Sequence, residues 1–402
     1  MTAVTATIRT QRAGSWWFPG ICLVLTGWCA NQYVSLIGWY QQHRELSEVA
    51  AFLVLASYVV GLLPMLVFAG SWADRLGRKP FTLLALIASI GGSVLLMLGA
   101  QAEVWLHAGR VLTGVGMGLA MVAATSWIKE VSPGASGAVR AGLCTSLGFA
   151  VGPVISGALV GATWNPELAY LVHAITAAAW LVLIAFQPGT PRREPVQQAV
   201  QGTSAQGLKI FNRLVLPMAP WVFGLATSGF AVVPALTGRG AGASLLFSTI
   251  TVAVTMGLGA LIQPFARRWD RPGTARLLII GLLTAITTYL VMIPVALTGS
   301  TALGLVASVL AGCANGILLL GGLGQVLALA GPGEVGKLTG RFYSVCYIGF
   351  LIPTLLSLWR LFADPLYFIL LLGVLCVLSL VCVLSNRTLL AGPKMQPVKS
   401  GS

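Results

Sequence analysis

The stretch GSWADRLGRKP, from Gly70 to Pro80, holds one acid and three bases within six positions, between two long runs that carry no charge. Charge is scarce in the rest of the chain, since 8% of the 402 residues are charged and 57% are hydrophobic. A soluble domain carries roughly 25% charged residues. We therefore expect the apolar runs to lie in a membrane, and the charged stretch to form a loop at its surface.

Runs of about 20 mainly apolar residues, the length that crosses a bilayer, occur twelve times in the sequence. Each is expected to be an α-helix, because lipid offers no partner for backbone N–H and C=O groups. We predict an all-α integral membrane protein. The predicted spans are Trp16–Gly38, Val49–Ala69, Phe81–Ala100, Val104–Ile128, Ala138–Ala162, Leu168–Gln187, Leu214–Leu236, Ser244–Ala266, Ala275–Leu297, Ala302–Leu329, Leu338–Trp359 and Pro365–Asn386.

The basic residues are distributed unequally between the two sides of these spans. If both termini share one side, all but four of the 24 Lys and Arg residues fall there; Arg44, Arg239 and Arg360 lie on the other side, and Arg110 lies within a span. Basic loops mark the cytoplasmic side, so we expect a multi-pass protein of the cell (plasma or inner) membrane with both termini in the cytoplasm. The net charge of +14 then reflects attraction to anionic lipid, and no nucleic-acid partner is expected.

The seven cysteines all lie within predicted spans and lack the spacing of a metal site or a disulfide framework. They are expected to pack as small apolar groups. Gly114, Gly116 and Gly118 are spaced like part of a dinucleotide fingerprint, but no strand precedes them. We therefore predict neither a metal nor a cofactor.

The charged loop recurs in the second half of the chain. The polar segment Pro188–Gly207 lies near the midpoint and is expected to link two groups of six spans. Beyond it, Ala266–Gly273 aligns without gaps to Gly70–Gly77 at an offset of 196 residues, so that Asp270 matches Asp74. Two six-helix bundles related by a parallel repeat are typical of transporters. The predicted parts are a first bundle at 1–187, a cytoplasmic linker at 188–213, and a second bundle with a short cytoplasmic tail at 214–402.

Three motifs in these spans resemble those of the major facilitator superfamily. Gly70–Lys79 matches the signature loop of that superfamily at every defining position. Leu106–Gly114 in span four is similar to its second motif, with Thr113 where Gln is usual. Gly148–Gly157 in span five resembles the motif of its antiporters, with Ser156 in place of Gly. The resemblance covers all twelve spans and implies a transporter like the twelve-helix drug/proton antiporters.

The resemblance also implies a role for the loop. In the superfamily the loop packs against the start of span eleven and latches the cytoplasmic gate. Asp74, between Gly70 and Gly77, is expected to approach that helix start, where free N–H groups and the helix dipole favour an anion. Lys337 and Arg341 lie in that region and are candidate ion-pair partners.

The alternative interpretation of the loop is that it only determines topology. Arg75, Arg78 and Lys79 are explained in this way, because basic residues hold a loop in the cytoplasm. Asp74 is not explained, since acidic residues contribute little to orientation. Asp270 is expected to matter less than Asp74, because Ala266 replaces Gly70 in the second copy of the loop.

Arg110 is the charged residue that lies inside a predicted span, and such residues are costly and usually functional. We predict that it lines an aqueous cavity. The alternative is that its guanidinium binds carbonyl groups of a neighbouring broken helix. Glu103, His107 and Arg110 share one helix face, which is consistent with a proton relay. The ordinary interpretation of Glu103 is a solvated residue at the helix end.

Spans one, four, seven and ten line the central cavity in the resembling fold. The candidate cavity residues beyond Arg110 are Trp28, Asn31, Gln32, Trp221, Asn315 and Gln325. Together they predict a mostly apolar cavity with one positive charge, suited to an amphipathic or anionic organic molecule. Gly152 and Pro153 are expected to bend span five, and the resemblance links their motif to export.

The leading functional prediction is a monomeric secondary transporter that exports a small organic molecule in exchange for protons. All ten acidic residues fall in loops or at helix ends, whereas proton-driven exporters of the family usually hold a carboxylate within a span. The alternative is therefore an importer or facilitator of a small anionic or amphipathic solute. A receptor would need a sensory domain, and an enzyme would need a nucleophile and a base at membrane depth. Neither is visible in the sequence, so no enzymatic activity is predicted.

Overall fold

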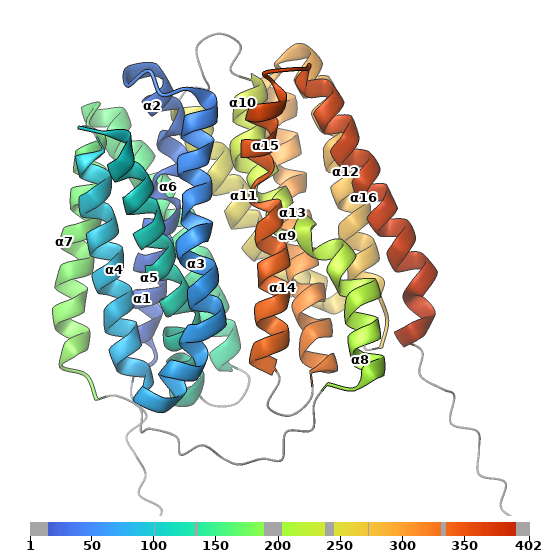
Figure 1. Ribbon diagram of the computed structural model, residues 1–402, viewed down its shortest axis with the longest axis horizontal. Coiled ribbons are helices and arrows are strands. Elements are labelled where there is room, and N and C mark those ends of the chain that lie inside the picture. The colour runs from blue at the N-terminus through green and yellow to red at the C-terminus, as the bar shows by residue number, and fades with distance from the viewer. Residues whose placement is uncertain are drawn as a thin grey trace, which may run out of the picture.

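The computed structural model describes residues 15–99, 101–132, 136–188, 203–237, 245–271, 273–330 and 335–390. Within these ranges all regular structure is helical, and twelve helices are long and apolar enough to cross a membrane. The predicted all-α membrane fold with twelve spans is confirmed. Figure 1 shows the first six spans on the left, in blue to green, and the last six on the right, in yellow to red.

The helices of the first bundle form the first six spans, and span one consists of three consecutive pieces. Their bounds are α1 Trp17–Gln32, η1 Val34–Leu36, α2 Ile37–His43, α3 Glu48–Leu76, α4 Arg78–Leu98, α5 Glu103–Val131, α6 Ser136–Thr163 and α7 Pro166–Ala185.

The second bundle has a similar plan, and span seven consists of five pieces. Their bounds are α8 Ala205–Ile210, η2 Phe211–Val215, α9 Leu216–Thr227, η3 Ser228–Val232, α10 Val233–Thr237, α11 Leu245–Ala266, η4 Arg267–Trp269, α12 Arg276–Thr298, α13 Thr301–Leu329, α14 Val335–Gly349, α15 Ile352–Trp359, α16 Pro365–Asn386 and η5 Arg387–Leu390. Span seven begins at Ala205 instead of the predicted Leu214, because Ser204 caps a helical turn within the predicted linker.

Local sequence signals set several helix ends. The side chain of Ser47 accepts a hydrogen bond from the N–H of Ala50 at the start of α3, and Ser300 does the same for Leu303 in α13. Asn165 caps α7 just before a proline at the first helical position. Gly77 has a φ of +98°, a conformation that favours glycine, and it ends α3 and starts α4 without an intervening loop.

Close contacts between spans one and five depend on glycine. A Cβ atom at Gly152 would lie 2.5 Å from the carbonyl oxygen of Trp28, and one at Gly148 would overlap the backbone of Val24. Pro153 lies inside α6 directly after Gly152. The motif Gly148–Gly157 therefore allows α6 to pack backbone to backbone on α1, as small residues do between membrane helices.

The internal repeat is visible in the hydrogen bonds. Gln32 of span one donates to the hydroxyl of Ser93 in span three at 2.9 Å. The residues 196 positions later are Ser228 of span seven and Tyr289 of span nine, whose hydroxyl groups lie 3.3 Å apart. Spans one and seven also break at matching positions, in the 3₁₀ turn η1 and the π-helical turn η3. π turns within helices are frequent at functional sites.

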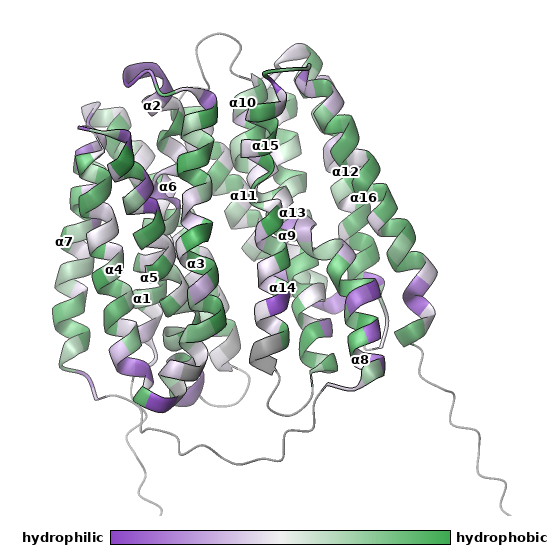
Figure 2. Cartoon of the chain, viewed as in Figure 1, coloured by the Kyte–Doolittle hydropathy of each residue, from purple (hydrophilic) through white to green (hydrophobic). Residues whose placement is uncertain are grey.

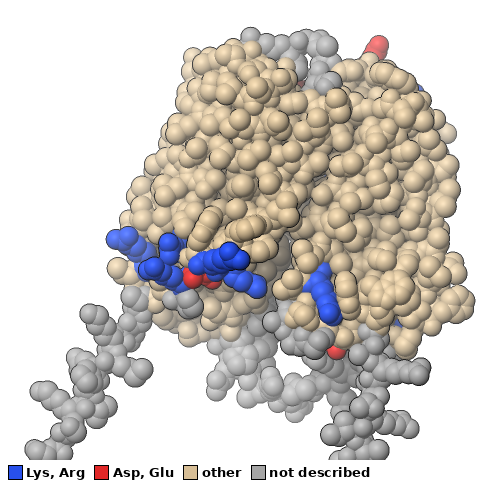
Figure 3. Space-filling model, turned by 180° about the vertical axis from the view of Figure 1, so that it is seen from behind, with Lys and Arg blue, Asp and Glu red and all other residues tan. Residues whose placement is uncertain are grey.

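The two ends of the molecule differ in charge. Apolar residues cover the middle of the helices, and hydrophilic residues gather at their ends (Figure 2). Lys and Arg cluster at the lower end in Figure 3, below an uncharged wall. We call this the basic end; it includes Arg78, Lys79, Arg140 and Arg276. The other, called the opposite end, holds Arg360 and the start of α3.

Candidate functional site between the two bundles

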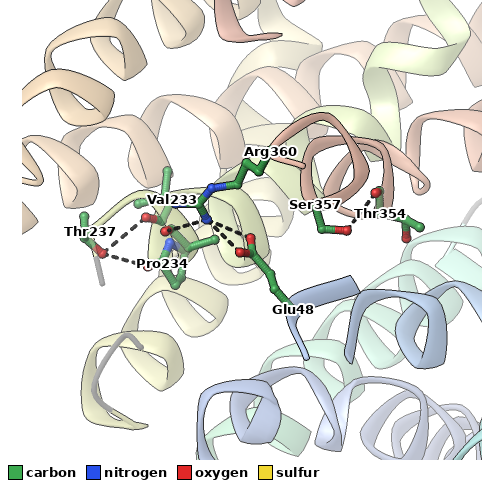
Figure 4. A network of polar contacts seen from close by, with 8 residues as sticks. Glu48, Val233, Pro234, Thr237, Thr354, Ser357 and Arg360 are labelled. Atoms are coloured by element: carbon green, nitrogen blue, oxygen red, sulfur yellow. Dashed lines mark hydrogen bonds and ion pairs between the residues drawn. The ribbon is translucent and has the colours of Figure 1, made fainter. Parts of the chain in front are cut away.

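An ion pair joins the two bundles at the opposite end. Arg360, directly after α15, donates from one nitrogen to both carboxylate oxygens of Glu48 at 2.8 and 2.9 Å (Figure 4). The same nitrogen lies 3.4 Å from the carbonyl oxygen of Ala235. About a third of each charged side chain is exposed. Nearby, the hydroxyl of Thr354 donates to the carbonyl of Phe52 at 2.9 Å. Both of these contacts join the first bundle to the second at the opposite end.

Aromatic side chains extend this contact toward the middle of the molecule. The ring of Tyr58 on α3 lies 6.4 Å from that of Tyr347 and 5.8 Å from that of Phe350, both in span eleven. Phe230 of η3 belongs to the same buried cluster. One continuous apolar core therefore crosses from the first bundle to the second below the ion pair.

A cavity of about 300 Å³ lies between the bundles at the opposite end. Val34 and Gly38 from the broken part of span one line it on one side, and Phe230 and Pro234 from span seven line it on the other. At the repeat offset of 196 residues, Val34 matches Phe230 and Gly38 matches Pro234. Glu48 and Arg360 also belong to its wall. The cavity thus lies on the approximate symmetry axis, where the two interrupted spans face each other.

Arg110 is fully buried. One terminal nitrogen donates to the carbonyl of Ala30 at 2.5 Å, and the other donates to that of Leu55 at 3.4 Å. Ala30 lies in the last turn of α1, where carbonyl groups lack partners within the helix. The guanidinium also lies over the rings of Tyr58 and Tyr33, at 4.8 and 5.6 Å. This geometry is that of the alternative interpretation, a guanidinium bound to carbonyls near a helix break. A cavity-lining role in another conformation stays a prediction.

The three residues of the predicted relay separate into two groups. Glu103 and His107 are in contact at 3.4 Å near the opposite end. His107 also lies 2.6 Å from the hydroxyl of Ser57. Arg110 turns instead to the carbonyls of α1 and α3. In this conformation the described contacts therefore join Glu103 to His107, but they do not continue to Arg110.

Most of the predicted cavity residues bind neighbouring helices. Asn31 donates to the carbonyl of Phe149 at 3.3 Å, and Asn315 donates to that of Val222 at 2.7 Å. The other two predicted residues of the second bundle also have partners: the indole of Trp221 donates to Ser379 at 2.8 Å, and Gln325 donates to the carbonyl of Thr274 at 3.0 Å. Polar side chains in spans commonly join helices in this way.

Trp28 and Gln32 belong to a buried polar cluster that the sequence analysis did not identify. Its centre is His173 on α7, which lies 2.8 Å from the hydroxyl of Ser93 and contacts Trp28 through its ring. A single histidine in the middle of span six was the signal that could have found it. Its partners come from α1 and α4, which sequence spacing does not connect to α7.

The stretch Gly70–Pro80 was expected to be a loop, but it is helical on both sides of Gly77, where α3 meets α4. It binds two helix ends of its own bundle. Arg78 lies 3.3 Å from the carboxylate of Glu130 at the end of α5. The ammonium of Lys79 donates to the carbonyls of Ala185, the last residue of α7, and of Gln187, at 2.7 and 2.6 Å. Cations near the C-terminus of a helix also interact favourably with its dipole. These two basic residues therefore hold the bundle together at the basic end, beyond any effect on topology.

Two of the side chains in the predicted latch at the cytoplasmic gate are not among those that the structure describes. Asp74 lies in the last turns of α3 and Lys337 in the first turn of α14, but neither side chain is among those described. Arg75 and Arg341 are exposed, on α3 and α14 respectively. Asp270 follows η4 and is exposed. The contact between Asp74 and span eleven stays a prediction.

Two six-helix bundles with matched breaks in spans one and seven define a polytopic membrane protein of the transporter class. The sequence profile of the Major Facilitator Superfamily matches residues 17–354. The chain belongs to this superfamily of membrane transporters, as the three motifs predicted.

Curated relatives include both drug-resistance proteins and sugar-alcohol transporters. The chain is 28% identical over 179 residues to "Multidrug resistance protein 1" of Bacillus subtilis (strain 168), covering 43% of this chain and 44% of that protein. It is 28% identical over 176 residues to "Tetracycline resistance protein, class D" of Salmonella ordonez, covering 42% and 43%. It is 25% identical over 208 residues to "Myo-inositol transporter 3A" of Cryptococcus neoformans, covering 50% and 34%. The aligned part spans less than half of each of these relatives.

Solved structures share the fold at low sequence identity. A POT family transporter in complex with 5-aminolevulinic acid superposes with a TM-score of 0.78 at 14% identity, covering 93% of this chain and 96% of that chain. A peptide transporter POT in complex with sulfate has a TM-score of 0.74 at 15% identity, covering 94% and 93%. At this identity the likeness concerns the fold alone.

Proposed function

We propose that this protein is a secondary active transporter that exports a small organic molecule in exchange for protons, by alternating access. The observation that carries the proposal is that polar contacts hold the two bundles together at the opposite end. The ion pair of Glu48 with Arg360 and the bond of Thr354 to Phe52 join them at one end, beside a cavity lined symmetrically by spans one and seven. A carrier needs such a closed end that can open, while the other end closes. The names of the drug-resistance relatives favour export.

The orientation follows from charge. Because basic loops stay in the cytoplasm, the basic end is the cytoplasmic end, and both termini are on that side. The protein then lies in the cell membrane, and the conformation described here is closed toward the outside. A reporter that is active only in the cytoplasm is expected to give a signal when fused after Gly207 and none when fused after Gly299. The reverse pattern would contradict this orientation.

The substrate class follows from the walls of the cavity. Val34 and Phe230 supply apolar surface, while Glu48 and Arg360 supply charges that neutralise each other in this conformation. We expect an amphipathic or anionic organic molecule, the kind that a largely apolar wall with few polar groups accepts. No cofactor is required for its movement, which a proton gradient would drive.

Import or facilitated diffusion is the second candidate function. It is favoured by the absence of any acidic residue from the interior of the predicted spans in the sequence. The relatives named as myo-inositol transporters also favour it. In this case the ion pair at the opposite end would still close the outer side, and only the direction and the coupling would differ.

Transport by the purified protein in liposomes distinguishes the two functions. The probes are tetracycline, ethidium and myo-inositol, each with and without an imposed pH gradient. The proposed function predicts that uptake of tetracycline or ethidium depends on the gradient and dissipates it. Gradient-independent equilibration of any probe would support the facilitator, and gradient-driven movement of myo-inositol would support the importer.

The latch can be tested within this proposal. If Asp74 caps the start of span eleven only when the cytoplasmic end is closed, Asp74→Asn weakens that state alone. A charge-assisted cap contributes roughly 1 to 2 kcal/mol, enough to change the ratio of the two states by about five to thirty fold. The variant is expected to label more strongly at a single cysteine placed on the cytoplasmic side of the cavity, with the seven native cysteines replaced. Asp270→Asn is the matched control and is expected to change labelling less. Equal labelling of Asp74→Asn and its parent would leave the loop with its topological role.

A further inference from the structure

The first bundle contains a buried polar cluster that the transport path described above does not use. His173 of α7 is fully buried, as are Gln32 of α1 and Ser93 of α4. The cluster also includes Cys29, whose sulfur lies 3.5 Å from the Ser93 hydroxyl. Three helices of one bundle therefore meet around one imidazole at a level where lipid surrounds the protein.

The hydrogen-bond partners of His173 determine which of its two ring nitrogens carries the hydrogen in the neutral form. Its Nε2 lies 3.0 Å from the carbonyl oxygen of Leu25, which can only accept, so Nε2 carries the hydrogen. Nδ1 then accepts a hydrogen bond from the hydroxyl of Ser93 at 2.8 Å. The Ser93 oxygen in turn accepts from the side-chain amide of Gln32 at 2.9 Å. The neutral imidazole is thus at one end of a short chain of hydrogen bonds that begins at span one.

The chain of hydrogen bonds ends at an unused acceptor. Gln32 Oε1 is buried and has no partner. The indole nitrogen of Trp28, whose ring contacts His173, is also buried without a partner. Unpaired buried polar atoms are rare in folded proteins and require an explanation. The unused Gln32 Oε1 has an explanation if the chain of hydrogen bonds can reverse its direction. Ser93 would then donate to Gln32 Oε1 instead of to His173.

The second bundle lacks the titratable group. The repeat keeps the polar contact between spans one and three as Ser228 with Tyr289. The residue 196 positions after His173, however, is Ile369, which is also fully buried. Packing at this point of the bundle is therefore compatible with an aliphatic side chain. The first bundle, unlike the second, therefore has a side chain here that can bind a proton, and packing does not require one.

We infer that His173 is the proton-binding site of this transporter, an inference that rests on the proposed proton exchange. A proton from water bonds to Nδ1 and converts the imidazole to an imidazolium. The Ser93 hydroxyl then turns, accepts from Nδ1–H, and donates to Gln32 Oε1 after the Gln32 amide has rotated. Release of the proton to water reverses each step, and no redox partner or other reactant is involved.

The neighbouring groups suit a site that is charged for only part of the cycle. Of the elements packed on α7, α1 supplies the thiols of Cys29 and of Cys22, which bonds to the carbonyl of Thr82. On α6, Cys144 lies against Gly20, and Arg140 donates to Ser132. The basic residues of α4 lie at its first turn, away from Ser93. Tyr170 on α7 itself pairs with Tyr40. No described carboxylate contacts His173, so its charge is not held permanently, while the ring of Trp28, 5.4 Å away, can attract an imidazolium.

Protonation would act directly on the broken part of span one. Gln32 is the last residue of α1, next to the turn whose Val34 lines the cavity. Ala30, two residues earlier, holds Arg110. Rotation of the Gln32 amide changes the contact of this helix end with span three. A proton at His173 therefore alters the segment that faces span seven, without a carboxylate in the path.

Nitrogen NMR of histidine-labelled protein tests the site without a transported substrate. The chain has three histidines, and His173→Gln identifies the signal of His173. We expect this signal to change reversibly from the neutral Nε2–H form to the imidazolium as the pH is lowered. Locking the opposite end closed, by cross-linking cysteines placed at Glu48 and Arg360, should lower the proton affinity by roughly tenfold, about one pH unit. A signal that stays neutral at every pH at which the protein is folded, or an equal midpoint with and without the lock, would overturn the inference.

Transport by His173→Gln separates a coupling role from a structural one. Glutamine keeps one donor and one acceptor but binds no proton at neutral pH. The variant is expected to lose tetracycline uptake driven by a pH gradient and to keep exchange of tetracycline across the membrane without a gradient. His43→Gln, at an exposed histidine at the end of α2, is the control and should retain both. Loss of both by His173→Gln, or loss of neither, would contradict a coupling role. If the parent protein moves none of the probes, the proposed function fails, whereas the NMR titration still decides whether His173 binds a proton.

Discussion

Replacing Arg110 by alanine is expected to destabilise the first bundle before it affects any step of transport. The side chain is fully buried and donates to the carbonyls of Ala30 and Leu55. Its removal leaves both carbonyls without that partner and opens a cavity beneath Tyr58. Lost hydrogen bonds and an unfilled cavity together cost about 2 to 4 kcal/mol. Thermal unfolding of the detergent-purified variant, followed by loss of monodisperse protein, measures this effect.

Two further variants interpret the result for Arg110. Val306 occupies the matching position in the second bundle and is 48% exposed, so Val306→Ala is expected to change stability by less than about 0.5 kcal/mol. Arg110→Lys keeps a charge but loses the planar group that reaches two carbonyls, and an intermediate loss is expected. If Arg110→Ala unfolds at the temperature of the parent but transports nothing, the residue lines the transport path, as the sequence analysis predicted.

The membrane fold could be predicted because its main signal is local. An apolar run such as Val49–Ala69 indicates directly that the segment lies in lipid, and the charged stretch Gly70–Pro80 indicates where the lipid ends. The repeat was equally readable, since Asp270 follows Asp74 at a fixed offset. These features depend on neighbouring residues and on composition, which a sequence displays.

The contacts of the candidate site could not be predicted, because they depend on which helix faces which. Arg110 was recognised as costly, but its partners are carbonyls, and every residue carries one. The position of Lys79 in the sequence indicates only topology, yet its ammonium donates to carbonyls at the C-terminal end of α7. His173 was overlooked because its partner Ser93 lies 80 residues away. The ion pair of Glu48 with Arg360 joins residues 312 positions apart, and both had been assigned to loops or helix ends without a partner.

Cross-linking cysteines at Glu48 and Arg360 is expected to abolish transport completely and reversibly. The two side chains join the bundles at the end that must open during alternating access. A short bifunctional thiol reagent with a reducible bond, applied after replacement of the seven native cysteines, would hold that end closed. Flux in liposomes should disappear on cross-linking and return on reduction. Without any cross-link, Glu48→Gln is expected to change the ratio of the two states by about two to five fold, because a partly exposed ion pair contributes roughly 0.5 to 1 kcal/mol.

The matched control for the cross-link lies at the same end but within one bundle. Arg44 and Glu167 form an ion pair at 3.4 Å between the region after α2 and the start of α7. Cysteines at these two positions meet the same reagent in the same exposed environment, but their cross-link joins parts that move together. Transport should therefore survive this cross-link while it is lost with the first one. Equal loss in both would indicate general damage by the reagent. Full transport with Glu48 and Arg360 cross-linked would mean that this end does not open, and alternating access about this closure would be wrong.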